Sequence, residues 1–153
     1  MRRRRLDLRE AAAVLAEGEL TMAQIATRLG VAKPTLYKLA GSRDELEMAC
    51  VDAETERLVG HVHEHLPADP PAPAVLRAMV AYAADSPGGF RLLFERRGPV
   101  APLRRIERRV GALLSRADAD LAAAALVGAS AAIVSRALAH GRELDAEALA
   151  IAL

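Results

Sequence analysis

The sequence predicts an all-α fold, and three observations carry this prediction. Alanine and leucine dominate an apolar fraction of 52%, whereas aromatic residues make up only 3%, a composition that favours helix. No stretch alternates apolar and polar residues between turn signals, as a half-buried strand would. Capping boxes and glycines recur at spacings typical of helix starts and ends. With 153 residues, the chain can form one or two small domains with a buried core.

The first helix is expected over residues 6–18, with Gly18 at its end. Its inward-facing residues are expected to be Leu6, Ala13 and Val14. The second helix begins at Thr21, because Thr21 and Gln24 have the spacing of a capping box. Gly30 ends it as a left-handed residue. The inner face of this second helix is expected to hold Ile25, Ala26 and Leu29.

A third helix follows at once, and Pro34 fits its first turn because a missing N–H costs nothing there. Gly41 ends this helix. Ser42 and Glu45 have the spacing of a second capping box, which opens a long fourth helix over residues 43–66. The buried stripe of the fourth helix is expected to hold Leu46, Cys50, Ala53, Leu58, Val62 and Leu66.

The second half of the chain begins with a proline-rich break at residues 67–73, because closely spaced prolines do not allow a continuous helix. A fifth helix is expected over residues 73–85. The Ser-Pro-Gly-Gly sequence at 86–89 predicts a turn, and residues 90–97 predict a short amphipathic helix.

Three further helices complete the prediction. Residues 100–116 are the clearest amphipathic helix, with apolar residues at i, i+4, i+7 and i+8 and arginines on the opposite side. An alanine-rich helix is expected over 119–140 and a short last helix over 145–153. We expect a first domain over residues 1–46 and a second domain over 47–153.

Charge and cysteine content limit the classes of protein. The net charge of +1 argues against a chain that is basic throughout, yet residues 91–116 hold eight Lys/Arg against two Asp/Glu, and residues 47–90 hold two against seven. Cys50 is the single cysteine, so no intrachain disulfide forms, which suits a reducing cytosol. The start of the chain lacks the apolar stretch of a signal peptide. The 14-residue apolar run at 121–134 is too short to span a bilayer. A cytoplasmic location without membrane association is therefore expected.

Residues 21–46 have the pattern of a helix-turn-helix, which places its second helix in the major groove of DNA. Ala26 and Gly30 supply the small residue and the turn glycine that two steeply crossing helices need, and Leu36 anchors the second helix. An ordinary pair of crossed helices without DNA binding is the alternative. Polar residues favour the first interpretation, because their side chains suit phosphate oxygens and base edges. The exposed polar residues of the third helix are Lys33, Thr35, Tyr37 and Lys38, and Arg28 and Arg43 lie within reach of the DNA backbone.

This segment resembles the DNA-binding domain of TetR-family transcriptional repressors. The matching residues are Ile25-Ala26, Gly30-Val31, Thr35-Leu36-Tyr37 and the run from Gly41 to Leu46. The resemblance covers about a sixth of the chain. It implies an all-helical homodimer with a three-helix DNA-binding domain and a larger helical domain that binds a small-molecule effector and releases double-stranded DNA.

The resemblance also implies roles for individual residues. Lys33, Pro34 and Tyr37 face DNA, Thr35 and Lys38 lie near phosphates, and Arg43 contacts a phosphate beside the fourth helix. The chain departs from the family pattern at Leu39-Ala40, where the family has an aromatic residue or His followed by Phe. We therefore expect a smaller core in this domain. The link between the first two helices and the C-terminal part are also short, so a reduced effector cavity, or none, is an open alternative.

Aromatic residues concentrate in one stretch of the second half, where Met79, Tyr82, Phe90 and Phe94 are the candidate effector-binding residues. A purely structural role in the core explains the same residues equally well. His61 and His65 have the i, i+4 spacing of metal ligands, but without a supporting motif we expect exposed histidines and no metal site. Cys50 is expected to fill the core.

Small residues on the alanine-rich helix, among them Gly128, Ala132 and Ser135, allow close helix approach, and we expect this helix and the last one to form a four-helix dimer interface. A tight core within one chain is the alternative. The arginines of 91–116 bind an anion or DNA in one interpretation and form a solvated face balanced by residues 47–90 in the other, which we favour. Residues 2–5 are either an arm along DNA or a solvated tail.

The prediction for function is a sequence-specific DNA-binding regulator, most simply a repressor, that needs no cofactor. The alternative is a helical protein-interaction module of the same fold that has lost DNA or effector binding. The sequence offers no nucleophile–base set, phosphate-binding loop or metal cluster, so we do not expect an enzyme.

Overall fold

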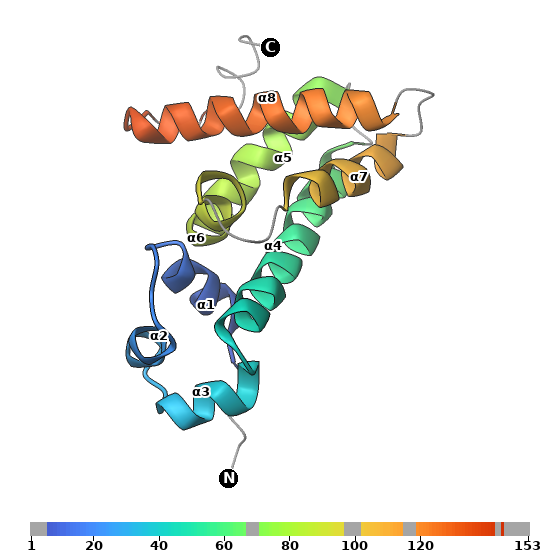
Figure 1. Cartoon of the computed structure of the whole chain (residues 1–153). Helices are drawn as coiled ribbons and strands as arrows, with labels where there is room; N and C mark the ends of the chain where they lie inside the picture. The colour runs from blue at the N-terminus through green and yellow to red at the C-terminus, as the bar shows by residue number, and fades with distance from the viewer. Residues whose placement is uncertain (1–5, 67–70, 97–101, 115–118, 143–144, 146–153) are drawn as a thin grey trace. The chain divides into compact units, whose positions relative to one another are not determined.

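The computed structural model describes residues 6–66, 71–96, 102–114, 119–142 and 145 (Figure 1). Within these ranges the chain is helical and contains no strand, so the predicted all-α fold is confirmed. Packing divides the chain into two compact units, Met1–Glu54 with Pro87–Val100 and Thr55–Ser86 with Ala101–Leu153. The division falls inside the long helix α4 (Arg43–His65). The domain boundary after residue 46 stays a prediction.

The first unit holds three short helices, the start of α4 and a late segment of the chain. These elements are α1 (Leu8–Leu15), α2 (Met22–Arg28), α3 (Lys33–Ala40), α6 (Pro87–Phe90) and the π-helix η1 (Arg91–Glu95). Helix α1 packs against α2, α6 and η1, and α2 packs against α3. The core of the helix-turn-helix is formed by Ile25, Ala26, Leu29 and Leu36, all of which are buried as expected.

The ends of α2 have the predicted geometry. Thr21 and Gln24 form a reciprocal capping box, in which the Thr21 side chain accepts from the Gln24 N–H and the Gln24 side chain accepts from the Thr21 N–H. Gly30 has a φ of 61°, which suits glycine because it carries no Cβ. The N–H of Val31 donates to the Ala26 carbonyl at 3.0 Å. This bond closes the turn and fixes where α3 starts.

The second predicted capping box opens α4. The Ser42 N–H donates to the Glu45 carboxylate at 2.6 Å, and the Glu45 N–H donates to the Ser42 hydroxyl at 3.2 Å. Of the predicted stripe on α4, Leu46, Cys50, Leu58 and Val62 are buried. Ala53 and Leu66 are half-buried instead.

The predicted inner face of the first helix was partly wrong. Ala13 is exposed and Leu6 is half-buried, whereas Val14 is buried as expected. Ala11, Ala12 and Leu15 fill the core instead. Helix α1 begins only at Leu8, after the N-cap Asp7, so Leu6 lies outside it. The buried residues Ala11, Val14 and Leu15 have the i, i+3 and i+4 spacing of one helix face, and Ala13 lies off that face.

The predicted turn at residues 86–89 was also wrong, because Pro87–Phe90 forms helix α6. Proline is favoured in a first helical turn, and the buried Gly88 lies against Ala13 of α1. Gly88 therefore serves close packing rather than a turn. The helix expected over 90–97 is the π-helix η1, whose wider turn shows in the bond from the Arg96 N–H to the Arg91 carbonyl at 3.0 Å.

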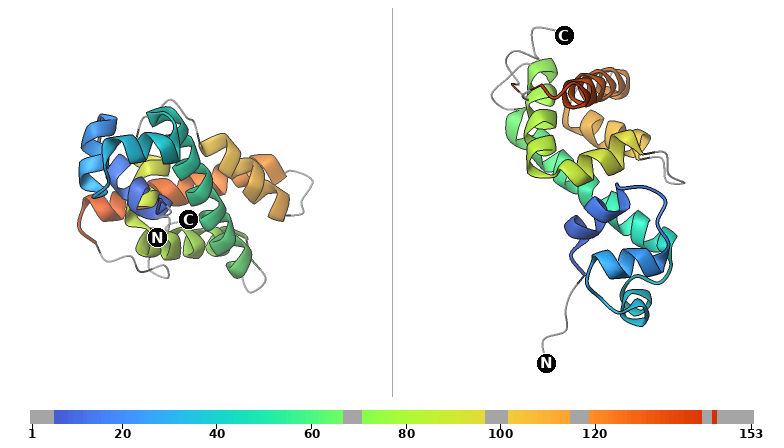
Figure 2. Two further views of the ribbon diagram at one scale, coloured as in Figure 1. Left: turned by 90° about the horizontal axis from the view of Figure 1, so that it is seen from below. Right: turned by 90° about the vertical axis from the view of Figure 1, so that its left-hand side faces the viewer.

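The second unit consists of the end of α4 with α5 (Pro71–Asp85), α7 (Leu103–Leu114) and α8 (Ala119–Ala139). Helix α8 packs against both α5 and α7 (Figures 1 and 2). The predicted amphipathic helix is confirmed in α7, where Ile106, Val110 and Leu114 are buried. Helix α5 begins at Pro71 rather than near residue 73, and prolines are tolerated in this first turn. Residues 67–70 of the predicted break lie outside the described residues.

Helix α8 is largely apolar, with the exposed Arg136 in its last turn. Val127, Ser130 and Val134 are buried, but Ala125, Ala132 and Leu138 are not. In the described part of the chain, the stretch Ala122–Ala139 is long and apolar enough to cross a membrane, with a mean hydropathy of 1.7, and 33% of it is buried. One such helix is weak evidence for a membrane span, because core helices have the same composition. The expected last helix over 145–153 lies outside the described residues except for Asp145.

Candidate nucleic-acid interface

Helix α3 presents a polar face that the rest of the first unit leaves uncovered. Its one fully buried side chain is Leu36, at 0% exposure. Because Leu36 faces α2 and the core, the residues on the other sides of α3 turn outward. Five of the predicted DNA-binding residues lie there and all are exposed; they are Lys33, Pro34, Thr35, Tyr37 and Lys38.

Two of these residues contact each other. The Lys33 ammonium lies 5.9 Å from the centre of the Tyr37 ring, at the i, i+4 spacing of one helix face. Tyr37 keeps 44% of its surface exposed. A cation above an aromatic face is attracted by the ring, so this contact orients both side chains on the exposed surface. The pair presents an ammonium and a phenol hydroxyl, which suit phosphate oxygens and base acceptors.

The two predicted arginine contacts have partners within the protein. Arg28 is exposed and pairs with Glu17 at 2.7 Å. Arg43 is directed inward: its Nε donates to the Leu20 carbonyl at 3.0 Å and its Nη2 donates to Glu19 at 3.0 Å. The side chain of Arg43 keeps only 22% exposure. Its contact with a DNA phosphate stays a prediction.

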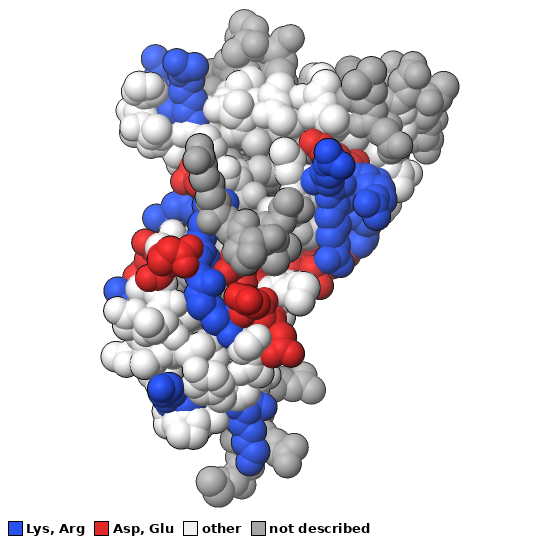
Figure 3. Space-filling model, in the orientation of Figure 1, with Lys and Arg blue, Asp and Glu red and all other residues white. Residues whose placement is uncertain are grey.

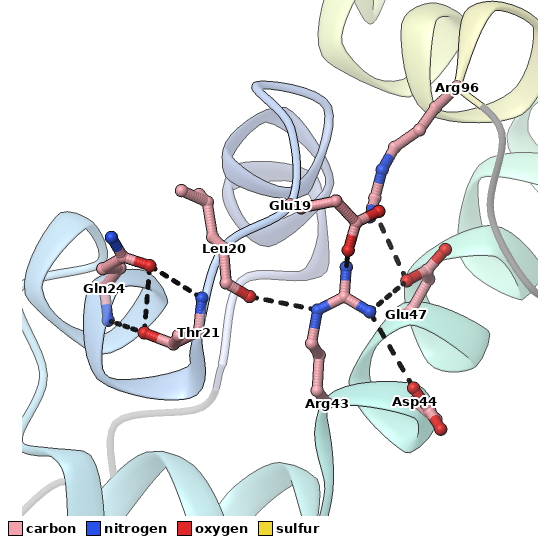
Figure 4. A network of polar contacts seen from close by, with 8 residues as sticks. All are labelled: Glu19, Leu20, Thr21, Gln24, Arg43, Asp44, Glu47 and Arg96. Atoms are coloured by element: carbon pink, nitrogen blue, oxygen red, sulfur yellow. Dashed lines mark hydrogen bonds and ion pairs between the residues drawn. The ribbon is translucent and has the colours of Figure 1, made fainter.

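Arg43 belongs to a cluster of charged groups at the start of α4, shown in Figure 4. We call Glu19, Arg43, Glu47 and Arg96 the four-charge cluster. Glu47 is 2% exposed and lies 3.2 Å from Arg43 and 3.5 Å from Arg96. Arg96 also donates to Glu19 at 2.9 Å. The cluster thus joins the loop before α2, the first turns of α4 and the residue after η1.

The electrostatics of this cluster favour ionised Glu19. The hydrogen bond from Arg96 and the charges of Arg43 and Arg96 hold the pKa of Glu19 below its usual range. One part of the cluster has a signal in the sequence, because Arg43 and Glu47 have the i, i+4 spacing of a helical ion pair. The contribution of Arg96 was not predicted, since Arg96 lies 49 residues beyond Glu47 in the chain.

Arginines of the second basic region balance acidic residues on α4. Arg96 pairs with Glu47, and both Nη atoms of Arg109 on α7 contact the Glu56 carboxylate. The pairing with residues 47–90 agrees with the favoured interpretation, but the expected solvated face was wrong for Arg96, whose side chain is 8% exposed. The arginines of α7 form a basic patch on the face in Figure 3. Its exposed members are Arg104, Arg105, Arg108 and Arg109.

The predicted effector-binding residues fall in both packing units. Met79 and Tyr82 of the second unit are 1% and 0% exposed. Phe90 and Phe94 of the first unit have ring centres 5.0 Å apart, with Phe90 buried and Phe94 half-buried. These positions are compatible with a role in the core, and an effector site formed by the four residues stays a prediction.

A cavity of about 240 Å³ lies in the first unit, beside the departure from the family pattern. Leu39 borders it and is 46% exposed. The apolar lining consists of Leu6, Leu29, Val31 and Leu39.

The expectation of exposed histidines holds for His63 near the end of α4 and was wrong for His61 and His65, which are half-buried against neighbouring groups. The His61 ring lies 6.1 Å from the Tyr82 ring, and its Nε2 is 3.9 Å from Asp85. His65 Nδ1 lies 2.7 Å from the His61 carbonyl oxygen. Across the described ranges, no three His, Cys, Asp or Glu side chains gather as metal ligands do.

Cys50 is expected to react slowly with thiol reagents in the folded protein. Its side chain is 0% exposed, and burial, with smaller effects from Glu54 and Glu47, raises its pKa to about 12. The reactive thiolate is therefore scarce near pH 8. A chromogenic disulfide reagent at pH 8 should release less than one equivalent of its coloured thiol per folded chain over minutes. In denaturant it should release one equivalent at once. Rapid release from the folded protein would contradict this assignment to the core.

Comparisons with known proteins agree with this geometry. No protein-family model matches the sequence, and no match is found among curated proteins. Among solved structures, the chain is similar to a TetR-like transcriptional regulator from Rhodococcus sp. RHA1, with a TM-score of 0.72 and 25% sequence identity. The match covers 94% of this chain and 89% of that chain.

The capped α2–α3 pair and its exposed polar face define a helix-turn-helix protein of the DNA-binding class. Within that class, the chain has the fold of TetR-family transcriptional regulators. The resemblance that residues 21–46 indicated is thus confirmed, and it extends over nearly the whole chain. The fold supports a DNA-binding regulator.

Proposed function

We propose that this protein is a cytoplasmic, sequence-specific DNA-binding transcriptional regulator that acts as a homodimeric repressor. The observation that carries the proposal is the face of α3, where Lys33, Thr35, Tyr37 and Lys38 are exposed while Leu36 is buried. A helix with this division, held by a glycine turn against α2, suits the major groove. The fold shared with a TetR-like regulator supports the same role.

Dimerisation through α8 is the second part of the proposal. Ala125 and Ala132 lie seven residues apart on one side of this helix and are exposed, as is Leu138 on another side, and exposed apolar surface marks a site of association. Two copies would give the two DNA-binding helices that a pseudo-palindromic operator needs, with half-sites about one helical turn apart or somewhat more. A small-molecule effector bound by the second half of the chain would release the DNA.

Selection from a pool of random duplexes tests this function. We expect enrichment of a pseudo-palindromic sequence, and a mass of two protein chains, or a multiple of two, on each bound duplex in native mass spectrometry. Affinity for the enriched duplex should fall steeply with salt, because phosphate contacts release counterions. Failure to enrich any sequence would instead favour an interaction module of the same fold that has lost DNA binding. A single chain at working concentration would overturn the dimer.

A further inference from the structure

The four-charge cluster directs the Arg43 guanidinium toward the protein. The guanidinium donates to the Leu20 carbonyl and to Glu19, and its Nη1 lies 3.2 Å from Glu47 and 3.9 Å from Asp44. Each of its three nitrogens therefore faces a protein atom, and the side chain keeps only 22% exposure. A phosphate held by the guanidinium in the two-bond geometry that arginine favours requires some of these interactions to be exchanged.

Glu47 makes this exchange costly if Arg43 is its counterion. The Glu47 side chain is 2% exposed, and an ionised carboxylate left buried without a partner is strongly unfavourable. Glu19 differs, because its side chain is 75% exposed and water can solvate it when a partner leaves. The buried carboxylate, and not the exposed one, therefore determines whether Arg43 is released.

Arg96 supplies a second cation for the same buried carboxylate. Its Nη1 lies 3.5 Å from Glu47 Oε2, and its side chain is 8% exposed, so it stays inside the first unit. Neither Glu47 Oε2 nor Arg96 Nη1 makes an aligned hydrogen bond in this structure. The two atoms that lack such a bond thus face each other, and a small rotation of the Arg96 guanidinium would join them.

We propose that Arg96 is the positioning residue that releases Arg43 to a DNA phosphate by taking over the buried Glu47. In the DNA-free protein both arginines share Glu47. When Arg43 turns outward, Arg96 aligns with Glu47 and keeps that carboxylate paired. Because Arg96 follows directly after η1, a movement of that segment would change DNA affinity through Arg43. This inference rests on the proposed function and adds a means of regulation to the same site.

The test is the salt dependence of affinity for the duplex enriched from the random pool. For Arg96→Gln, we expect about fivefold to tenfold weaker binding and a salt slope reduced by about 0.9 for each subunit, the value of one lost phosphate contact. Arg43→Gln should reduce the slope by the same amount. In a Glu47→Gln background, Arg96→Gln should have no further effect on affinity, because no buried charge then holds Arg43.

Matched variants separate this role from stability and from the proposed function. Arg91→Gln removes an equal charge from η1 outside the cluster and should leave the salt slope unchanged. Arg96→Lys keeps a cation beside Glu47 and should keep the salt slope of the unaltered chain. If Arg96→Gln unfolds, the Glu47→Gln/Arg96→Gln pair and Arg96→Lys still decide the question. The exchange is overturned if Arg96→Gln leaves the salt slope unchanged. It is also overturned if Arg96→Gln lowers DNA affinity equally in the unaltered chain and in Glu47→Gln. Either result leaves the proposed function standing. Absence of DNA binding by the unaltered chain overturns the proposed function and the exchange with it.

Discussion

Replacing Lys33 or Tyr37 by alanine is expected to abolish operator binding at working concentrations. Each side chain is exposed on α3, and the two contact each other at 5.9 Å. A specific contact in the groove is worth about 1–3 kcal/mol, and a homodimer would lose it at both half-sites, so affinity should fall by roughly 30-fold to more than 10,000-fold. Titration of labelled operator DNA measures this loss.

The melting temperature of both variants should change little, because exposed substitutions alter stability by only about 0.5 kcal/mol. Arg104→Ala on α7 is the matched control, since it removes one exposed positive charge from the basic patch of the second unit. We expect it to retain operator binding. Equal affinity of the unaltered chain and Lys33→Ala would refute the placement of α3 in the groove, and a large loss in Arg104→Ala would favour a second DNA contact.

Gly88→Ala is expected to destabilise the first unit. A Cβ at this position would lie 2.5 Å from the Ala13 Cα and 2.6 Å from the Ala13 Cβ. Both atoms belong to rigid parts of α1, so α6 and α1 would have to move apart. Overpacking of this kind costs about 1–3 kcal/mol. Urea unfolding monitored by circular dichroism should show a lower midpoint.

Gly60→Ala provides the opposite result in the same assay. Gly60 lies inside α4, and apart from the adjacent residues and the backbone of this helix nothing lies within 4 Å of the position that its Cβ would occupy. Alanine in a helix interior is favoured over glycine by about 0.5–1 kcal/mol, so the midpoint should rise. If Gly88→Ala matched Gly60→Ala, the close packing of α6 on α1 would not be a constraint on the fold.

Local signals predicted the helix-turn-helix well. Each contact of these motifs joins residues at most five positions apart, as in the capping boxes at Thr21 and Ser42 and the turn at Gly30. Both partners of each contact can therefore be recognised in a short stretch of sequence. The face of α3 followed from helical periodicity around Leu36. The match of the fold to a TetR-like regulator extends this agreement to nearly the whole chain.

The errors arose where distant parts of the chain meet. Gly88 indicated a turn because local rules favour glycine in turns, yet its partner is Ala13, 75 residues earlier. Arg96 resembled a surface arginine, but the structure places it against a buried carboxylate of α4. The periodicity of a helix does not predict contacts between residues that are far apart in the chain. They also explain why the sequence identified Arg43 as a candidate phosphate contact and gave no sign that Arg96 would share its partners.

The π-helix η1 has a consequence for how this chain tolerates insertions and deletions. Its bond from the Arg96 N–H to the Arg91 carbonyl spans five residues, one more than an α-helical turn allows. Loss of a single residue from this segment would restore ordinary helical winding and rotate the following side chain by about 100° around the axis. The Arg96 guanidinium would then point away from the carboxylates of Glu19 and Glu47. Chains that descend from this one should therefore keep the length of residues 91–95 more strictly than the identity of its exposed members.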